Sequence, residues 1–148
     1  MRNRSLVLPA VACALALSFA CAKKGDPVKD TLDRMVKAAN ARDVGKLFEN
    51  VAADFQAADG SGRAEAEALV RRIFSAYEIL NVSIHDVQVE KGENAARVRL
   101  SADLSGQPVK IGGLDGLVPS SAKYDFDLRL TSDGKTWKVA WASWQPKE

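Results

Sequence analysis

Apolar residues recur at three- and four-residue steps in the first half of the chain and alternate with polar residues in the second half. The first pattern is typical of amphipathic helices and the second of half-buried strands. Three helices are therefore expected, followed by strands. The first helix starts at Asp26-Pro27, where Asp26 is a suitable N-cap and Pro27 a suitable first helical residue, and it runs to about Asn40.

The two further helices are separated by turns. Asp43 can cap a short second helix that ends at Asp54-Phe55, and its apolar positions are Val44, Leu47, Phe48 and Val51. The turn at residues 59–62 precedes the third helix, which carries the longest apolar face in the chain. That face consists of Ala66, Leu69, Val70, Ile73, Phe74, Tyr77 and Leu80. We expect Ile73 and Phe74 to lie in the core, between this helix and the sheet.

Four strands are expected after the helices. The first changes phase between Ile84 and Val87, which predicts a bulge at His85-Asp86, and a turn at residues 92–94 leads into the second. The second and third strands place only Ala, Val, Leu, Phe and Tyr inward, and residues 105–122 between them read as a long apolar loop. These inward residues are Ala96, Val98, Leu100, Ala102 and Leu104, and then Tyr124, Phe126, Leu128 and Leu130.

The last strand, from Trp137 to Trp144, has apolar residues on both faces. Strict alternation places Trp137 and Trp141 on one face and Ala140, Ala142 and Trp144 on the other. The two tryptophans either close the core or form an outward apolar patch, and such patches mark interaction sites. We favour the outward position and expect a homodimer or partner contact centred on Trp141.

The first twenty residues have the pattern of a secretory signal peptide. Arg2 and Arg4 precede an apolar stretch that is shorter than the about 20 residues of a membrane-spanning helix. Residues 17–21, which end in Ala20-Cys21, resemble a bacterial lipobox, although Ser18 and Phe19 depart from its usual residues. The resemblance implies cleavage before Cys21 and lipid attachment to it. An ordinary signal peptide is the alternative.

Cysteine usage agrees with the lipoprotein interpretation. Cys13 would leave with the signal peptide, and Cys21 would otherwise be an unpaired thiol in an exported protein. Resemblance to bacterial lipoproteins further implies an outer-membrane location facing the periplasm, because Ala22 replaces the Asp that retains such proteins in the inner membrane. The alternatives are the inner membrane and the soluble periplasm. Residues 21–26 would form the tether and residues 27–146 the domain. The expected partners are the membrane and either a second copy of the chain or another envelope protein.

Composition excludes several functions. The chain has 21 Lys+Arg and 19 Asp+Glu, and the two totals are equal without Arg2 and Arg4, so no basic surface for nucleic acid is expected. His85 is the only histidine and has no cluster of carboxylates near it in the sequence, which argues against a metal site. No phosphate loop or serine elbow is present. We therefore assign no catalytic residue and expect no cofactor.

The order of the elements resembles that of the nuclear transport factor 2-like superfamily. The resemblance covers residues 27–144 and rests on Ala39, Arg42-Asp43, Leu47 and Ala53-Asp54-Phe55. It implies an α+β fold in which three helices pack on a curved, mixed, mostly antiparallel sheet to form a cone, the cystatin-like architecture. It also implies that any site lies inside the cone, and Asp54, Tyr77 and Tyr124 are the candidate pocket residues.

Two functions remain open. The first is a non-catalytic binding or assembly module on a membrane anchor. The second is a carrier, or a small enzyme of the isomerase, dehydratase or cyclase sort, that acts on an apolar small molecule in the cone. The apolar inward rows favour the first function. A cavity with convergent polar groups would favour the second.

Overall fold

The computed structural model describes residues 25–110 and 118–148. Its elements, in chain order, are α1 (Pro27–Asn40), α2 (Val44–Phe48), β1 (Val51–Ala57), α3 (Arg63–Ser75), β2 (Tyr77–Lys91), β3 (Ala95–Pro108), β4 (Ser121–Ser132) and β5 (Trp137–Pro146). The strands form one sheet in the order β1-β5-β4-β3-β2, in which only the β1–β5 pair is parallel. The expected α+β fold with a mixed, mostly antiparallel sheet is confirmed. Cys21 and the expected cleavage site lie outside the described residues.

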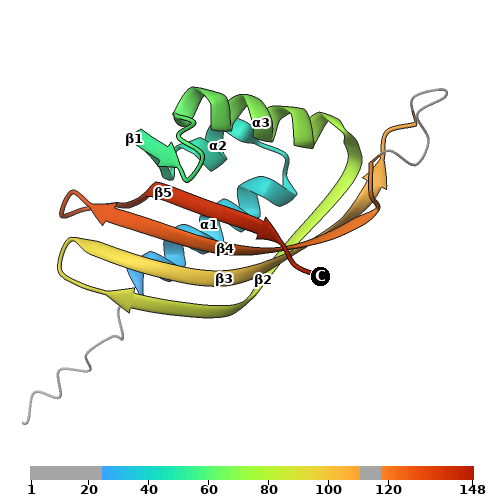
Figure 1. Ribbon diagram of the computed structural model, residues 1–148. Coiled ribbons are helices and arrows are strands. Elements are labelled where there is room, and N and C mark those ends of the chain that lie inside the picture. Colours follow the sequence, from blue (N-terminus) through green and yellow to red (C-terminus); the bar gives the residue numbers. More distant parts are fainter. Residues whose placement is uncertain (1–24, 111–117) are drawn as a thin grey trace, which may run out of the picture.

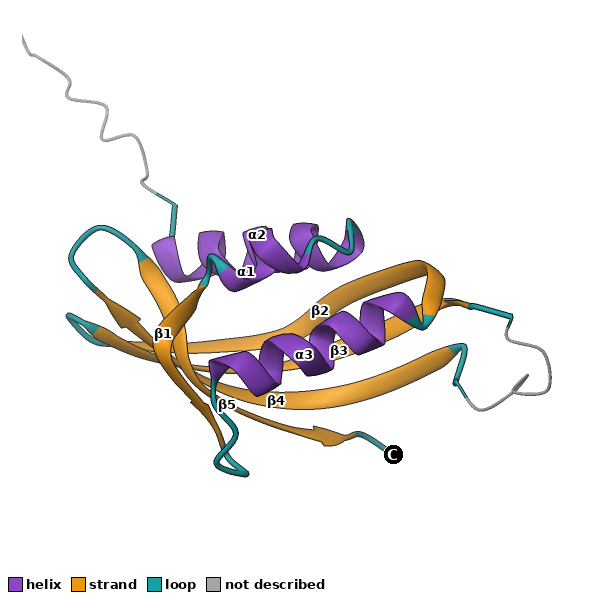
Figure 2. Cartoon of the chain, turned by 90° about the horizontal axis from the view of Figure 1, so that it is seen from above, coloured by secondary structure: helices purple, strands orange, loops and turns teal. Residues whose placement is uncertain are grey.

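The helices lie on one side of a curved sheet. Figure 1 shows α3 above the long, bent strands and α1 behind them, and Figure 2 shows α1 and α3 apart from each other on the same side of the sheet. Helix α1 packs on β2 and β5, whereas α3 packs on α2, β1 and β2. The concave face of the sheet therefore carries the helices, and its opposite face is uncovered in the described part of the chain.

Side-chain hydrogen bonds fix both ends of α1. The Asp26 carboxylate accepts a hydrogen bond from the Val28 amide at 3.0 Å, which satisfies one of the unpaired N–H groups of the first turn. At the other end, the Asn40 amide nitrogen donates to the Val82 carbonyl at 3.0 Å, and Asn40 Oδ1 accepts from the Val82 amide. Asn40 thus occupies the backbone groups that β2 would otherwise expose at the edge of the sheet.

The second helix is shorter than expected, because it ends at Phe48 and is followed by strand β1. The expectation that Val51 is helical is wrong. Val51 falls on the helical repeat of Val44 and Phe48, but it pairs with Val139 of β5 instead. This pairing joins residues that are far apart in the sequence, so a local periodicity could not reveal it.

The third helix ends at Ser75, not at Leu80, and Tyr77 and Leu80 are buried in the first part of β2. Both residues lie on the helical repeat of Phe74, which explains the wrong boundary. Gly106 permits the close approach of β2 and β3 here. A Cβ atom at Gly106 would lie 2.3 Å from the Ile79 carbonyl oxygen.

The strand boundaries agree in part with the sequence. The bulge at His85-Asp86 is confirmed by a register shift and by a φ of 53° at Asp86, and the turn before Ala95 is also present. The loop between β3 and β4 is shorter than the predicted residues 105–122, because β3 continues to Pro108 and β4 begins at Ser121. Residues 111–117 of that loop lie outside the described residues.

Trp137 and Trp141 lie on opposite faces of β5, whereas strict alternation predicted the same face. Leu130 pairs with Val139 but Arg129 pairs with Trp141, so Ala140 is an extra residue that reverses the alternation. Trp137 is in the core, with 6% of its surface exposed. Trp141 is half-buried on the outer face, and the Arg129 guanidinium lies 4.5 Å from its ring centroid.

The core lies between the helices and the sheet. Phe74 is buried, and Ile73 packs against the core from a half-buried position, as the apolar face of the third helix predicts. Leu130, Val98 and Val28 are among the most deeply buried side chains. The core therefore joins α1 to the middle of the sheet.

Candidate functional site

Three aromatic side chains lie next to one another on the concave face of the sheet. Tyr124, Phe126 and Trp144 form this group, called here the aromatic row. Phe126 pairs with Trp144 across β4 and β5, and its ring centroid lies 6.3 Å from that of Tyr124 and 6.5 Å from that of Trp144. Phe126 has the same parity as the buried residues Leu128 and Leu130, so the aromatic row points to the helix side of the sheet.

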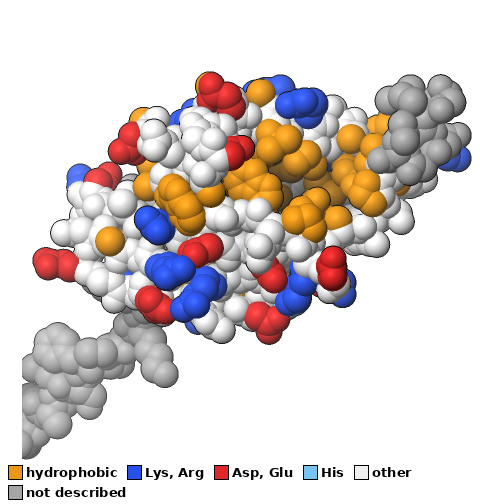
Figure 3. All heavy atoms as spheres, viewed as in Figure 1, with side chains coloured by type: hydrophobic (Ala, Val, Ile, Leu, Met, Phe, Trp, Pro, Cys, Tyr) orange, Lys and Arg blue, Asp and Glu red, His pale blue; other side chains and the backbone are white. Residues whose placement is uncertain are grey.

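The aromatic row is open to solvent although it points inward. Tyr124 and Phe126 are half-buried, and Trp144 keeps 36% of its surface exposed. The exposure arises because α3 packs on β1 and β2 and makes no extensive contact with β4 or β5. Figure 3 shows hydrophobic side chains gathered between α3 and the strands on the face in view. This part of the concave face is therefore an accessible apolar surface.

Two phenols lie close together at one end of the aromatic row, Tyr124 within it and Tyr77 beside Tyr124. The Tyr77 hydroxyl donates a 2.7 Å hydrogen bond to the Pro119 carbonyl, and the ring of Tyr77 is buried. Burial raises the pKa of Tyr77, and the nearby Tyr124 phenol raises it further. Tyr77 is consequently a neutral hydrogen-bond donor at physiological pH and cannot serve as a general base. The structure thus brings together two of the three predicted pocket residues.

Asp54, the third predicted pocket residue, does not join them. It lies on the edge strand β1 with an exposed side chain, while the neighbouring Phe55 is buried. The inward rows of β3 and β4 also contain no carboxylate and no imidazole over the described residues. No group of His, Cys, Asp and Glu side chains within residues 25–110 and 118–148 could hold a metal ion. The chemistry of the concave face is therefore that of aromatic rings and phenols.

Sequence reasoning placed Phe126 and Tyr124 on the inward side but missed Trp144 as their neighbour. The favoured outward position of Trp141 already puts Trp144 on the inward face, but alternation does not give the register that places Trp144 opposite Phe126. The apolar character of both faces of β5 was the one available signal, and it does not specify which residue of β4 lies opposite each tryptophan. The aromatic row therefore becomes visible only in the folded chain.

The opposite face of the sheet carries a polar depression of about 470 Å³. Its floor includes Ser101, whose hydroxyl donates to Asp125 Oδ1 at 2.6 Å. Arg97 forms two hydrogen bonds with Asp127, at 3.0 and 2.5 Å, as cross-strand charge pairing predicts. Arg99 instead pairs with Glu90 at 2.8 Å. These two arginines are therefore each paired with a carboxylate on this face.

His85 lies at the margin of this outer face. Its Nδ1 is 2.8 Å from Asp86 Oδ2, and its Nε2 is 3.3 Å from Asp103 Oδ2. The hydrogen bond with Asp86 raises the pKa of His85, and the one with Asp103 adds to this effect. The sequence predicted an exposed bulge residue but did not reveal this double contact, because Asp103 comes from the neighbouring strand.

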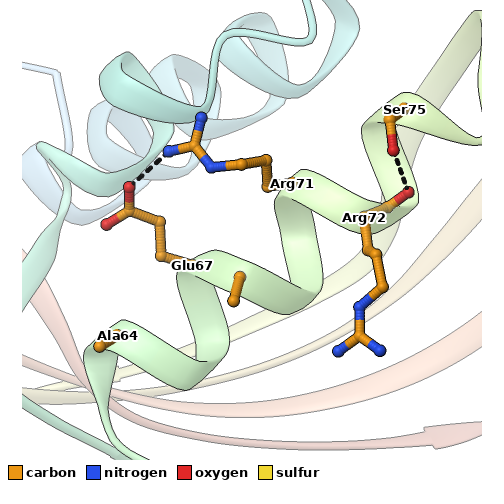
Figure 4. Close-up of a pocket in the computed structure, with 6 residues that line it drawn as sticks. Ala64, Glu67, Arg71, Arg72 and Ser75 are labelled. Carbon is orange, nitrogen blue, oxygen red and sulfur yellow. Dashed lines mark hydrogen bonds and ion pairs between the residues drawn. The ribbon is translucent and has the colours of Figure 1, made fainter.

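A second shallow depression, of about 530 Å³, lies on the solvent side of α3. Figure 4 shows that its lining side chains all come from this helix: Ala64, Glu67, Ala68, Arg71, Arg72 and Ser75. Arg71 donates to Glu67 at 2.8 Å, while Arg72 extends to the other side of the helix. One helix surface does not enclose a ligand, so this depression is not a candidate site.

Within residues 25–110 and 118–148, no helix combines the length and the apolar character that crossing a bilayer requires. No protein-family model and no curated protein matches the sequence significantly.

Solved structures do match the fold. A putative scytalone dehydratase from Novosphingobium aromaticivorans aligns with a TM-score of 0.71 and 11% identity, over 82% of this chain and 83% of that one. A hexachlorocyclohexane dehydrochlorinase from Novosphingobium barchaimii aligns with a TM-score of 0.64 and 12% identity, over 82% and 85%. A Nostoc punctiforme protein of unknown function with a cystatin-like fold aligns with a TM-score of 0.63 and 9% identity, over 82% and 89%. The chain therefore has the cystatin-like, nuclear transport factor 2-like fold.

Proposed function

We propose that the protein binds an apolar small molecule on the concave face of its sheet, against the aromatic row. The observation that carries this proposal is the partial exposure of three inward-pointing aromatic side chains beside a packed core. Small-molecule sites are concave and mainly apolar, with a few polar groups that orient the ligand. The aromatic row supplies the apolar surface, and the phenols of Tyr77 and Tyr124 supply the polar groups.

The geometry favours binding over chemistry. The Tyr77 hydroxyl is already engaged with Pro119, and its raised pKa keeps it protonated. A general base needs a pKa near the working pH, and the inward rows of β3 and β4 offer no carboxylate or imidazole in the described residues. Carriage or sequestration of the ligand is therefore the leading form of the proposal.

An elimination enzyme is the second candidate function. Two of the solved structures with this fold have names that denote the removal of water and of hydrogen chloride, a dehydratase and a dehydrochlorinase. A neutral phenol can donate a hydrogen bond to a departing group. Elimination also needs a base for the carbon-bound proton, however, and the described inward residues of β3 and β4 offer no carboxylate or imidazole for that step, so this candidate ranks second. Loss of product formation in Tyr124→Phe, with ligand binding retained, would distinguish this function from carriage.

A fluorescent probe tests the binding site. N-phenyl-1-naphthylamine is neutral and apolar, and its emission rises when it leaves water. We expect saturable binding to the purified protein and roughly tenfold weaker binding to Trp144→Ala, since about 1.4 kcal/mol of lost contact corresponds to a factor of ten. Trp141→Ala is the matched control, because Trp141 lies on the outer face of the same strand. Equal affinity in the two variants would contradict the proposal.

The site would work close to a membrane. Lipid attachment at Cys21 leaves a short segment before α1, which begins at Pro27. An apolar ligand has low solubility in water, so a binding domain beside a bilayer would be well placed to receive or deliver it. We place the anchored protein on the periplasmic face of the outer membrane, on the grounds of the lipobox-like residues and Ala22.

A further inference from the structure

The end of β5 that carries Trp144 is held by one neighbouring strand. Strand β1 pairs with β5 as far as Ala142, whereas the pairing with β4 continues to Pro146. Trp144 lies between these two limits, opposite Phe126. Figure 1 shows β5 extending past β1 toward the C-terminus. Over the described residues, the segment 143–146 is therefore an edge of the sheet, and edge segments with few contacts open at a low cost in free energy.

Lys147 holds the chain immediately after this segment. Its backbone amide donates to the Lys123 carbonyl of β4 at 2.9 Å. Its ammonium donates to the Ser101 hydroxyl of β3 at 3.0 Å and lies 3.4 Å from Asp125 Oδ1 of β4. Ser101 and Asp125 are paired across these two strands. Lys147 thus joins the end of β5 to both β4 and β3.

This contact is made on the outer face of the sheet, behind the aromatic row. Asp125 precedes Phe126 in β4 and has the opposite parity, so its side chain points away from the row. Ser101 is its cross-strand partner and lies on the same outer face, where both residues line the polar depression. Lys147 therefore acts on the end of β5 from the side of the sheet that the proposed ligand does not occupy.

The Ser101 hydroxyl gives the contact a defined geometry. Ser101 is 5% exposed, and its hydroxyl donates to Asp125 Oδ1 at 2.6 Å while it accepts from Lys147. The bond from Ser101 is the largest of the causes that lower the pKa of Asp125, and the charge of Lys147 also lowers it, so the carboxylate is ionised at physiological pH. A buried hydroxyl between two opposite charges specifies one position for the ammonium.

We propose that Lys147 is a positioning residue of the ligand site: from the outer face it fixes the end of β5 and thereby keeps the Trp144 ring beside Phe126. This inference rests on the proposed function, because it assigns to Lys147 an effect on the same binding surface. When the segment 143–146 separates from β4, the aromatic row loses one of its three rings. The apparent affinity for an apolar ligand then falls in proportion to the fraction of molecules in which the segment is paired.

The first test needs no ligand. Lys147→Met removes the ammonium and keeps an unbranched side chain, Lys147→Arg keeps a cation, and Lys138→Met is the matched control at the other end of β5. The ring centroids of Phe126 and Trp144 lie 6.5 Å apart, so an NOE between the two rings reports the paired segment. We expect Lys147→Met to weaken this NOE and to speed amide hydrogen exchange at residues 143–145. Lys147→Arg should largely retain both readouts, and Lys138→Met should retain them in full. An unchanged NOE and unchanged exchange in Lys147→Met would overturn the inference.

The second test measures the affinity of N-phenyl-1-naphthylamine. We expect about two- to fivefold weaker binding to Lys147→Met, which corresponds to a paired fraction between about a half and a fifth, and unchanged binding to Lys138→Met. A general loss of stability would weaken binding whether or not Trp144 is present. Combining Lys147→Met with Trp144→Ala separates the two cases. The ring that Lys147 positions is then already absent, so the Lys147 substitution should have no further effect.

The outcomes separate this inference from the proposed function. If the probe binds the wild-type protein and Lys147→Met equally well, the inference is wrong and the proposed function stands. An equal further loss in the Trp144→Ala background would also contradict the inference, because Lys147 would then act on the whole fold. If the folded wild-type protein does not bind the probe, the proposed function fails, and the role of Lys147 in binding fails with it.

Discussion

Tyr77 joins several parts of the molecule at a single residue. Its carbonyl accepts a hydrogen bond from Arg42, its hydroxyl donates to Pro119, and its ring lies where Gly106 allows β2 and β3 to approach. These contacts hold the phenol beside Tyr124 at the border of the aromatic row. The residue that sequence reasoning assigned to a helix thus serves as the connection between α3, the sheet and the candidate site.

His85 provides a test of the electrostatics at the residue scale. Its contacts with Asp86 and Asp103 raise its pKa, so NMR titration of the imidazole should give a pKa above the ordinary value for histidine. Asp86→Asn should lower this pKa more than Asp103→Asn, because the hydrogen bond with Asp86 is the larger cause. An unchanged pKa in Asp86→Asn would show that this contact is absent in solution.

The sign of the pH effect follows from the raised pKa. Protonated His85 is the form that the two carboxylates favour, so its contribution to stability is fully present below the ordinary pKa of histidine. That contribution is lost as the pH rises through the pKa of the folded protein. Because His85 is exposed, we expect this dependence to be visible in the titration rather than as a large change in unfolding.

At the scale of elements, the sequence predicted the parts of the fold that depend on local periodicity. The start of α1, the face of α3, the bulge in β2 and the inward rows of β3 and β4 all follow from apolar spacing and capping residues. Strand β1 was missed because its parallel pairing with β5 joins Val51 to Val139, and the helical spacing of Val51 gave a competing interpretation. The aromatic row was missed because alternation in β5 gives the face of Trp144 but not the register that places it opposite Phe126.

Helix α3 is held to the sheet by Phe74, and a substitution there tests the core. Phe74→Ala should lower the free energy of unfolding by about 3–5 kcal/mol, as expected for loss of a buried phenyl ring. Leu69→Ala is the control on the same helix, because Leu69 is only half-buried. Chemical denaturation should show a much smaller change for Leu69→Ala. Similar losses in both variants would mean that the buried face of α3 is assigned wrongly.

Strand β5 allows a test of the expected interface. Trp141 lies on the uncovered face of the sheet beneath Arg129, whereas Trp137 is buried in the core and is not available to a partner. If the outer face is a dimer contact, the purified protein should have the mass of a dimer in solution and Trp141→Arg should be a monomer. A wild-type monomer, with an unfolded Trp141→Arg variant, would instead assign Trp141 a structural role.

At the scale of the whole molecule, the arrangement separates two surfaces. The concave face has an accessible apolar area with phenols, and the opposite face has a network of paired charges. A ligand on the first surface and a partner on the second would not compete. The expected lipid at Cys21 would add a third contact, with the membrane, next to the start of α1.

The anchor is tested by fractionation of the cells that produce the protein. Cys21→Ser removes the thiol to which lipid would be attached, and we expect it to move the protein from the membrane fraction to the soluble fraction. Cys13→Ser is the control, because Cys13 lies within the expected signal peptide and should not change the distribution. If Cys21→Ser and the wild-type protein fractionate alike, the lipoprotein interpretation is wrong.

The central claim is that an apolar molecule binds to the aromatic row on the concave face. The most direct measurement is an NMR experiment that records intermolecular NOEs between N-phenyl-1-naphthylamine and the aromatic protons of the protein. The account predicts NOEs from the probe to the rings of Phe126 and Trp144, with none to the outer-face ring of Trp141. NOEs confined to Trp141, or a saturating probe without contacts to Phe126 and Trp144, would contradict it.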